Sequence, residues 1–416
     1  MKPCVVFIAT YDTKGKESEF VKQRILEHGV DCLTIDVGVG VAPAATPDIG
    51  LKDLCAGTAY TVEAIRAMPR GDAVGVVSDL VEKYVTQLHH KGEMSAIIGI
   101  GGAGGTQIVT QTMRMLPFGL PKLMLSTLAS GNVRWYLQDS DICMMPSVAD
   151  VCGLNFIMEP VFSRFAAMAA AAAKWYAQAE AGLKHMITDR TRLRVGMTMY
   201  GTTTRGVTES REELERLQYE TVVFHASGAG GRSMERFITQ GAIHGVLDMT
   251  IAEIGAHLVG GLHDAGPHRL EAAVSMGIPM VLVPGAADTI VLPPINDVPD
   301  KFRNNRILNK HNPTMTTMRT NVEENIQIAN FIADKLENTR SPVKILLPLG
   351  GLSSIDRPGQ VFYMPEANEA LFETLRGRLA GSPVEILEDP RHLYDSGFGK
   401  KAAGLLDEMM RQHYGA

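Results

Sequence analysis

The sequence has few cysteines, and their arrangement excludes two classes of protein. Only five cysteines occur in 416 residues, and no two of them form a C-x-x-C pair. An odd, dispersed set is unlike a disulfide framework or a cysteine zinc site. A reducing compartment fits this pattern better, and we therefore predict a cytoplasmic protein.

Basic patches and long apolar runs are also missing. The formal net charge is −6, and no block of Lys and Arg is interleaved with aromatic residues, which argues against a nucleic-acid surface. The apolar run Val5–Ala9 is too short for a signal peptide or a membrane-spanning helix, and it is better explained as a strand. We expect neither nucleic acid nor a membrane as a partner.

Length and composition predict a folded chain with two domains. Hydrophobic residues make up 45% of the chain and charged residues 21%, close to globular averages, so no long segment needs to be disordered. Domains usually contain about 100–200 residues, which indicates two cores here. An alanine-rich helical stretch ends near Met186 and a polar segment follows. We place the domains at residues 1–186 and 193–416.

Short apolar strands alternate with helical patterns in both halves of the chain. In the first half Val5–Ala9, Cys32–Val37 and Ser95–Ile100 have the composition of strands, and Lys16–His28 carries apolar residues at helical spacing. Arg194–Tyr200 restarts the alternation in the second half. The order predicts an α/β fold with two doubly wound, Rossmann-like domains, largely parallel sheets and an interdomain cleft.

A glycine-rich segment follows the strand that ends at Ile100. Residues Gly99–Gly104 match G-x-G-x-x-G, which lets backbone N–H groups and a helix N-terminus approach phosphate oxygens closely. A dinucleotide site also needs an acidic residue about twenty positions later, where this chain has Met124. The Walker pattern fails too, because no Lys-Ser/Thr pair closes the loop. Lys14 and Lys16 are the nearest candidate cations by topology.

The loop after the first predicted strand should face the same crevice, because ligands of open α/β sheets bind beyond the carboxyl ends of adjacent strands. Its hydroxyls, carboxylate and ammonium suit a polyphosphate bound with Mg²⁺. The alternative is a set of tight turns with helix-capping side chains. The predicted nucleotide-binding residues are Thr10, Tyr11, Asp12, Thr13, Lys14, Asp36, Gly101, Gly102, Gly104, Gly105, Thr106, Ser126 and Thr127.

Four carboxylates stand near predicted strand ends, where a carboxylate can hold Mg²⁺ or cap a helix. These are Asp12, Asp36, Asp141 and Asp150. The sequence leaves both roles open for each of them. In the second half Glu253 and His257 lie four residues apart on a predicted helix, but they match no tight metal-binding signature.

The second half repeats the glycine tetrad of the first. Gly228–Gly231 is identical in sequence to Gly102–Gly105, and each tetrad lies between an apolar strand and a helical pattern. Both are candidate anion cradles. Phosphoryl transfer or ATP-driven ligation would also need a cation near the terminal phosphate and a base. The candidate catalytic residues are Lys14, His225, Glu253 and Arg269.

Taken together, these motifs resemble the ATP-binding domain family typified by the plant tobamovirus resistance protein, which has stand-alone bacterial members. The similarity spans nearly all 416 residues. The resemblance implies ATP in the N-terminal domain, a second α/β domain and a homodimer, and the 22 methionines suit adaptable apolar surfaces. Its carriers are Ala9–Lys14, Gly101–Thr106, Ser126-Thr127 with Ala129–Gly131, Phe224–Gly228 through Met234-Glu235, Ala265–Pro267 with Arg269–Ala273, and His311–Pro313.

Two functional hypotheses follow from the motifs and the resemblance. The first is an enzyme that uses ATP, with Mg²⁺, to act on a small anionic metabolite in the interdomain cleft. The second is a nucleotide-gated regulatory module that works with a separate barrel protein, since a barrel domain follows in the plant protein. Tight ATP binding without turnover would favour the second hypothesis.

Overall fold

Two parallel sheets organise the chain, each in its own part of the sequence. The computed structural model describes residues 2–40 and 45–415. The chain divides into two units, Met1–Met186 and Ile187–Ala416. Within the described residues no helix combines the length and the apolar character that crossing a bilayer requires.

The first unit alternates strands and helices, as its sequence predicts. Its strands are β1 (Cys4–Ala9), β2 (Asp31–Asp36), β3 (Ala96–Gly101), β4 (Lys122–Ser126) and β5 (Ile142–Pro146). Its helices are α1 (Tyr11–Glu27), α2 (Leu51–Cys55), α3 (Val62–Arg66), α4 (Arg70–His90), α5 (Ala103–Met115), α6 (Arg134–Leu137) and α7 (Met158–Thr188).

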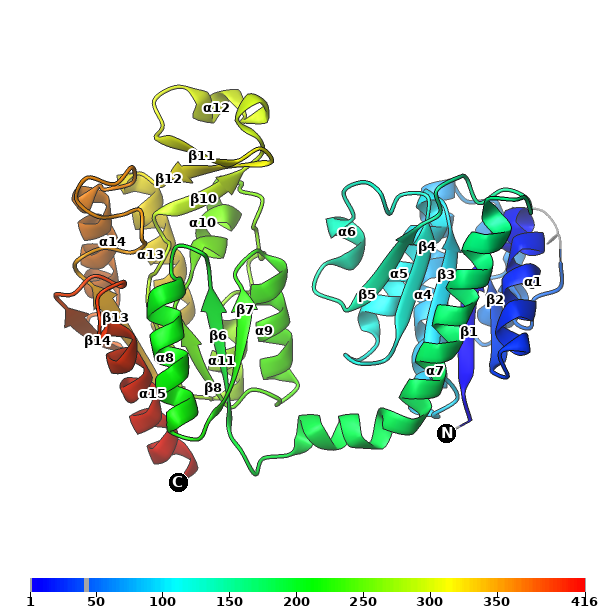
Figure 1. The fold of residues 1–416 in the computed structure, drawn as a ribbon, viewed down its shortest axis with the longest axis horizontal. Helices are drawn as coiled ribbons and strands as arrows, with labels where there is room; N and C mark the ends of the chain where they lie inside the picture. Colours follow the sequence, from blue (N-terminus) through cyan, green and yellow to red (C-terminus); the bar gives the residue numbers. More distant parts are fainter. Residues whose placement is uncertain (1, 41–44, 416) are drawn as a thin grey trace. The chain divides into compact units, whose positions relative to one another are not determined.

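The strand order of the first unit has one switch point. The strands pair in the order β2-β1-β3-β4-β5, and every pair is parallel. Side chains alternate along β1, so Val5 and Phe7 join the core with α1 and α7, whereas Val6 and Ile8 join the core with α4 and α5. Helices α1 and α5 therefore leave β1 and β3 on opposite faces of the sheet (Figure 1).

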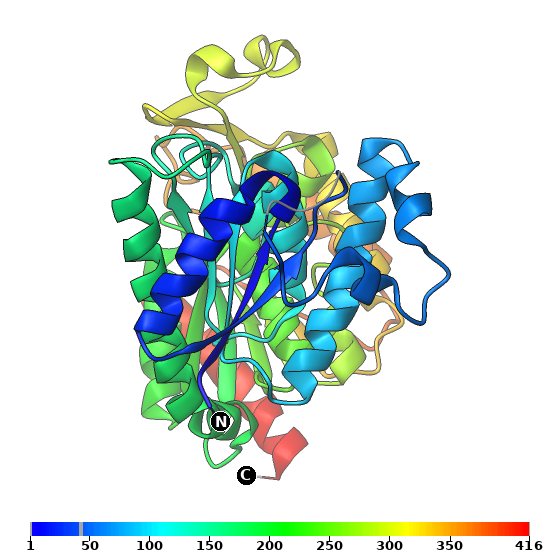
Figure 2. The ribbon, with the colours of Figure 1, turned by 90° about the vertical axis from the view of Figure 1, so that its right-hand side faces the viewer.

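Aromatic packing fixes α1 on its face of the sheet. Phe20 of α1 lies against Phe162 of α7, with ring centroids 6.3 Å apart, and the two helices run beside each other across the sheet (Figure 2). Both rings add a large apolar area to the core on this side. The start of α1 is thereby held at the carboxyl end of β1.

Only Thr10 separates β1 from α1, although the sequence predicts a loop over Thr10–Lys14. The carboxylate of Asp36, at the end of β2, accepts a hydrogen bond from the Tyr11 N–H at 2.9 Å. This bond satisfies one of the N–H groups that a helix start leaves unpaired. Lys14 departs from helical angles, with φ −127° and ψ 17°. The expected loop is thus an irregular first turn of the helix.

The second unit contains a larger parallel sheet and a small antiparallel one. The parallel strands are β6 (Arg194–Met199), β7 (Glu220–His225), β8 (Gly245–Asp248), β9 (Met280–Leu282), β13 (Val343–Pro348) and β14 (Glu385–Asp389), in the order β14-β13-β9-β8-β6-β7. The antiparallel strands are β10 (Thr289–Leu292), β11 (Leu308–Asn312) and β12 (Met315–Arg319), in the order β10-β12-β11. The sequence patterns do not predict this antiparallel sheet.

Helices cover both faces of the larger sheet. Helices α8 (Thr204–Arg216) and α15 (Phe398–Tyr414) share one core, and α9 (Ala229–Thr239), α11 (Glu271–Met276), α13 (Val322–Leu336) and α14 (Pro365–Arg378) share the other. Helix α10 (Ala252–Val259) contacts α13 and β10, and the short α12 (Asp300–Arg303) lies near the β10–β12 sheet (Figure 1). The predicted α/β fold with two largely parallel sheets is confirmed.

The glycines of the G-x-G-x-x-G segment have different structural roles, and stability measurements separate them. A Cβ at Gly99 would lie 2.5 Å from Val109 Cγ1, whereas a Cβ at Gly104 would meet nothing within 4 Å. Because Val109 is β-branched and buried, we expect Gly99→Ala to lower the free energy of unfolding by about 1–3 kcal/mol. We expect Gly104→Ala to leave it unchanged or slightly raised. Urea denaturation checks both, and equal midpoints for the two variants would contradict the assignment.

Candidate functional site

A cavity of about 600 Å³ lies at the carboxyl ends of β1 and β3 in the first unit. This is the switch point of the strand order, where doubly wound sheets bind their ligands. The volume is within the usual range for small-molecule sites. The lining residues are Thr10, Asp12, Thr13, Lys14, Val37, Val39, Gly40, Ile65, Arg66, Met68, Arg70, Ala73, Val74, Gly102, Ala103, Gly104, Gly105 and Ile108.

The first turn of α5 forms one wall of this cavity. Its N-cap is Gly102, and no described side chain caps the helix. The N–H of Thr106 donates to the Gly102 carbonyl at 2.9 Å, which closes the first turn of the helix. The N–H groups before Thr106 belong to the set that a helix leaves unpaired, and together with the helix dipole they favour an anion. The open space around Gly104 gives a ligand access to this turn.

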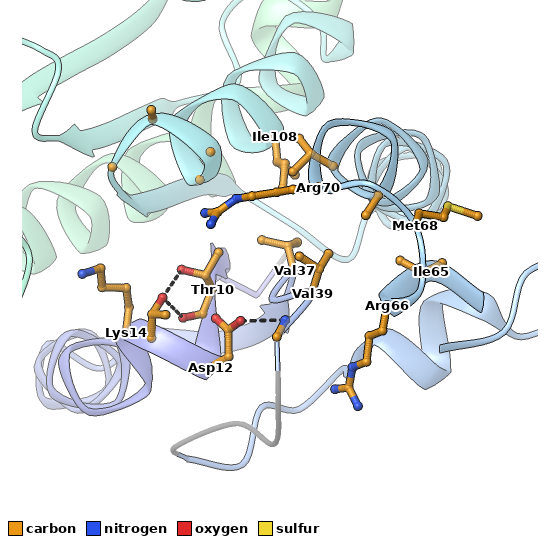
Figure 3. A pocket seen from close by; sticks show the side chains of 18 residues that line it. Thr10, Asp12, Lys14, Val37, Val39, Ile65, Arg66, Met68, Arg70 and Ile108 are labelled. Atoms are coloured by element: carbon orange, nitrogen blue, oxygen red, sulfur yellow. Dashed lines mark hydrogen bonds between the residues drawn. The ribbon is translucent and has the colours of Figure 1, made fainter. Parts of the chain in front are cut away.

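The start of α1 forms the opposite wall. The hydroxyls of Thr10 and Thr13 lie 3.0 Å apart, and Oδ2 of Asp12 accepts the Gly40 N–H at 2.9 Å. This second bond ties the segment after β2 to the edge of the cavity. Figure 3 shows Thr10, Asp12 and Lys14 along one side of the cavity. Two hydroxyls, one carboxylate and one ammonium thus belong to residues that line this side of the cavity.

Two arginines that the sequence analysis did not select also line the cavity. Arg70 is the first residue of α4, and its guanidinium extends toward the side occupied by Thr10 (Figure 3). Arg66 ends α3 near the other side. An arginine at the start of a surface helix is common in any sequence, so no local signal marks Arg70. The remaining wall is apolar and consists mainly of Val37, Val39, Ile65, Met68, Ala73, Val74 and Ile108.

The predicted nucleotide-binding residues divide into two groups. Thr10, Asp12, Thr13, Lys14, Gly102, Gly104 and Gly105 line the cavity. Tyr11, Asp36, Gly101, Thr106, Ser126 and Thr127 do not. The structure therefore does not indicate direct contact between the second group and a ligand in the cavity. The contacts of these residues with the rest of the protein give the physical reason.

Tyr11 and Asp36 support the site from beneath. The Tyr11 ring is fully buried in the core shared by α1 and α7. Asp36 is 6% exposed, and its Oδ1 accepts the N–H groups of Tyr11 at 2.9 Å and of Gly38 at 2.7 Å. Burial raises the pKa of the Asp36 carboxyl above its ordinary value, against the opposing effect of these two hydrogen bonds. Asp36 therefore joins β2 to the start of α1.

The other residues of this group are packed or face elsewhere. The hydroxyls of Thr106 and Ser126 are buried and lie 2.7 Å apart, which links α5 to β4. A Cβ at Gly101 would lie 3.3 Å from Gly105 Cα, so Gly101 allows α5 to approach β3 closely. Thr127 lines a separate cavity near the ends of β4 and β5.

In the second unit a carboxylate of the protein occupies the Gly228–Gly231 tetrad. Oε1 of Glu253 accepts the Gly228 N–H at 2.6 Å and the Gly231 N–H at 3.0 Å. A Cβ at Gly231 would lie 2.0 Å from Oε2 of Glu253, and one at Gly230 would lie 1.8 Å from the His225 carbonyl oxygen. The tetrad does cradle an anion, but that anion is a side chain of the protein. The second candidate anion cradle is therefore filled by Glu253.

Arg269 forms ion pairs with three carboxylates, of which Asp248 and Glu253 are buried and Glu235 is half-buried. Its Nε donates to Glu253 at 2.9 Å, Nη1 to Glu235 at 2.9 Å and Nη2 to Asp248 at 2.7 Å. Burial acts to lower the pKa of Arg269, but the attraction of Asp248, Glu253 and Glu235 outweighs it and raises the pKa. Burial likewise raises the pKa of Glu235. Glu253 and Arg269 thus have the contacts of a buried ion cluster, and their predicted catalytic roles stay predictions.

His225, the remaining catalytic candidate, lies apart from that cluster. It ends β7 with an exposed side chain, and its ring lies 5.4 Å from the ring of Tyr200. Across residues 2–40 and 45–415 no three His, Cys, Asp or Glu side chains form a group that could hold a metal ion. His225 and Glu253 belong to the second unit and Lys14 to the first.

Two family profiles cover most of the chain. The profile of the N-terminal domain of the uncharacterised protein family UPF0261 matches residues 3–178, and that of the C-terminal domain matches residues 192–410. The chain belongs to the UPF0261 family. A UPF0261 protein of Clostridium tetani is 41% identical over 413 residues, which cover 99% of this chain and 100% of that protein.

The UPF0261 relatives include plant proteins. The ToMV resistance protein Tm-1(GCR237) of Solanum lycopersicum is 35% identical over 427 residues, which cover 98% of this chain and 55% of the tomato protein. The chain therefore spans about half the length of that relative. This agrees with the resemblance stated from the motifs. Among solved structures, MurG of Acinetobacter baumannii matches over 98% of this chain and 100% of that chain, with a TM-score of 0.24 and 12% identity.

From the contacts of Arg269 we predict a large loss of stability when this cation is removed, and a much smaller loss when an exposed arginine is removed. Arg269→Met leaves two buried carboxylates and one half-buried carboxylate without their counter-charge, which costs about 3–5 kcal/mol of unfolding free energy. Urea denaturation followed by far-UV circular dichroism measures this loss. The exposed Arg216 provides the control, since Arg216→Met should change stability by less than about 0.5 kcal/mol.

The loss of unfolding free energy in Arg269→Met should also depend on pH, and it should become smaller as the pH falls. Burial already raises the pKa of Glu235, and removing Arg269 takes away the attraction that opposes this rise, so protonation of Glu235 stabilises the folded variant. The deficit relative to the unsubstituted protein should shrink as pH falls from about 7 to about 5. A deficit that is constant over this interval would contradict this role of Arg269 beside Glu235.

Proposed function

We propose that the first unit binds ATP in the cavity between the starts of α1 and α5. The observation that supports this most is the convergence on one cavity of an uncapped helix start, an ammonium and a guanidinium, beside an apolar wall. A ligand with a polyanionic end and a flat apolar end matches this distribution. The resemblance stated from the motifs implies the same ligand.

The phosphates of ATP would occupy the polar end of the cavity. Backbone N–H groups at the start of α5 are the donors, and Lys14 and Arg70 supply positive charge that a Walker lysine would supply elsewhere. Thr10 and Thr13 add hydroxyls. Mg²⁺ on nucleotide phosphates commonly takes only one or two protein carboxylates, and Asp12 is the one that lines the cavity. Oδ2 of Asp12 accepts the Gly40 N–H, and within the described residues Oδ1 accepts no hydrogen bond.

The adenine ring would lie against the apolar wall. Val37 and Val39 come from the segment after β2, Ile65 and Met68 flank the end of α3, and Ile108 comes from α5. Small-molecule sites are lined mainly by such side chains, with a few polar groups that fix orientation. The labelled side chains of Figure 3 show this separation, with Lys14 and Thr10 on one side and Ile65 and Met68 on the other.

An ATP-utilising enzyme and a nucleotide-gated module remain the two proposals for what binding achieves. Among the described residues that line the cavity, Asp12 is the only carboxylate, and none is a histidine or a cysteine. A phosphoryl-transfer enzyme would therefore rely on Asp12 or on a second substrate for its base. Release of ADP or AMP in a screen of metabolites would favour the enzyme, and tight binding with negligible turnover would favour the module.

Two substitutions test the placement of the phosphates. Gly104→Val puts a branched side chain into open cavity space, and we expect it to abolish ATP binding while the protein stays folded. Lys14→Ala removes one charge-assisted contact, about 1.5–3 kcal/mol, and should weaken binding by about ten- to a hundredfold. Isothermal titration calorimetry with MgATP measures both effects.

The chain offers a matched control for each substitution. Gly75 lies in α4, a Cβ there would meet nothing within 4 Å, and the residue does not line the cavity. Lys16 is exposed, lies two residues from Lys14 on the same helix and does not line the cavity either. Gly75→Val and Lys16→Ala should bind ATP like the unsubstituted protein. Unchanged affinity in both Gly104→Val and Lys14→Ala would place the nucleotide elsewhere.

A further inference from the structure

The first unit has a second cavity, of about 500 Å³, at the carboxyl ends of β4 and β5. The residues that line it are Thr127, Ser130, Pro146, Ser147, Val148, Ala149 and Asp150. They follow the two strands that come next to β3 in the sheet order. The cavity therefore lies on the same sheet edge as the proposed nucleotide site, further from the switch point.

A residue of the first cavity lies close to a residue of the second. Gly102 lines the first cavity and Thr127 lines the second. A Cβ at Gly102 would lie 3.7 Å from Thr127 Oγ1, and the Thr127 N–H donates to the Gly101 carbonyl at 3.2 Å. A molecule in the second cavity would thus lie beside the end of the first cavity that we assign to phosphate.

The segment after β5 forms the far wall of the second cavity, and hydrogen bonds connect this segment to the rest of the unit. The Ser147 N–H donates to the Ser126 carbonyl at 3.3 Å, and the Ser147 hydroxyl donates to the Ala149 carbonyl at 2.5 Å. Glu17 of α1 accepts the N–H of Gly153, a little further along the same segment. These bonds pre-form the wall, which lowers the ordering cost of binding.

The polar side chains that line this cavity all end in oxygen atoms. Hydroxyls of Thr127 and Ser130 and the carboxylate of Asp150 line it, and these three side chains form no hydrogen bond within the described part of the chain. Asp150 is the one charged residue among the described lining residues, and its side chain is exposed. An anion would meet this carboxylate without a compensating cation. An ammonium group would find an acceptor of opposite charge with hydroxyls around it.

We propose that the second cavity binds a small amine that also carries hydroxyl groups. Asp150 accepts the ammonium, and Thr127 and Ser130 bind the hydroxyls. This site is separate from the proposed ATP site and does not depend on it, although the two ligands would be neighbours. The charge it selects is opposite to that of the anionic metabolite expected from the sequence.

Three probes of one skeleton test the charge preference of the cavity. 3-Amino-1,2-propanediol, glycerol and glycerate differ at a single position, which carries an ammonium, a hydroxyl or a carboxylate. Ligand-observed saturation-transfer NMR titrations with the full chain give their relative affinities. We expect the amino diol to bind about two- to fivefold more tightly than glycerol, because an ion pair at an exposed carboxylate contributes up to about 1 kcal/mol, and glycerate to bind most weakly.

Two variants assign the contacts. Asp150→Asn should reduce the affinity for the amino diol to that for glycerol and leave glycerol unchanged. Thr127→Val, which is nearly isosteric, should weaken the binding of the amino diol and of glycerol to the same extent. Asp79, an exposed residue of α4 outside both cavities, is the matched control, and Asp79→Asn should change nothing.

The proposal is overturned if glycerate binds as well as the amino diol, if none of the three probes binds at about 100 mM, or if Asp150→Asn leaves the amino diol unaffected. Melting curves by circular dichroism confirm that each variant is folded. MgATP titrations of the same samples keep the two sites apart. If the preference for the amine is lost and ATP binding is normal, only the proposal for the second cavity is contradicted. If ATP does not bind and the preference for the amine is intact, only the proposed ATP site is contradicted.

Discussion

The parallel pairing of β1 with both β2 and β3 is the constraint on which the first unit depends. It sends α1 and α5 to opposite faces of the sheet, so their starts stand on either side of one crevice. Asp36 then binds the Tyr11 N–H and fixes where α1 begins. The uncapped start of α5, the ammonium of Lys14 and the guanidinium of Arg70 face one cavity as a result. The chemistry of the site follows from strand order before any single side chain is considered.

The two identical glycine tetrads show how far local sequence determines local chemistry. Each begins a helix after a parallel strand, and each presents backbone N–H groups at that start. At Gly228–Gly231 a glutamate 25 residues later in the chain fills the cradle, and Arg269 holds that glutamate in turn. At Gly102–Gly105 no described side chain caps the helix. The difference lies in tertiary partners, which the tetrad itself does not encode.

Much of the fold could be predicted from the sequence, because buried parallel strands and amphipathic helices have strong periodic patterns. Val5–Ala9 and Arg194–Tyr200 correspond closely to β1 and β6. The β10–β12 sheet could not be predicted this way, because its three short strands pair through antiparallel contacts within an excursion between β9 and α13. Within the candidate site, the glycines and Lys14 carried local signals. Arg70 and the apolar wall did not, since only the tertiary fold brings α3 and α4 to the cavity.

The contrast between Gly104 and Gly230 has a consequence for how sequence variation in this family should be interpreted. Any side chain at Gly230 would collide with the backbone of β7, so purifying selection for folding alone would keep that glycine. A side chain at Gly104 would meet no protein atom, so only selection for what enters the cavity would keep it. Family members that retain the second tetrad but vary at the first would thus be lineages that kept the fold and no longer bind a ligand in this cavity. Two identical tetrads can therefore be invariant for different reasons, one because the chain must fold and the other because the cavity must stay open.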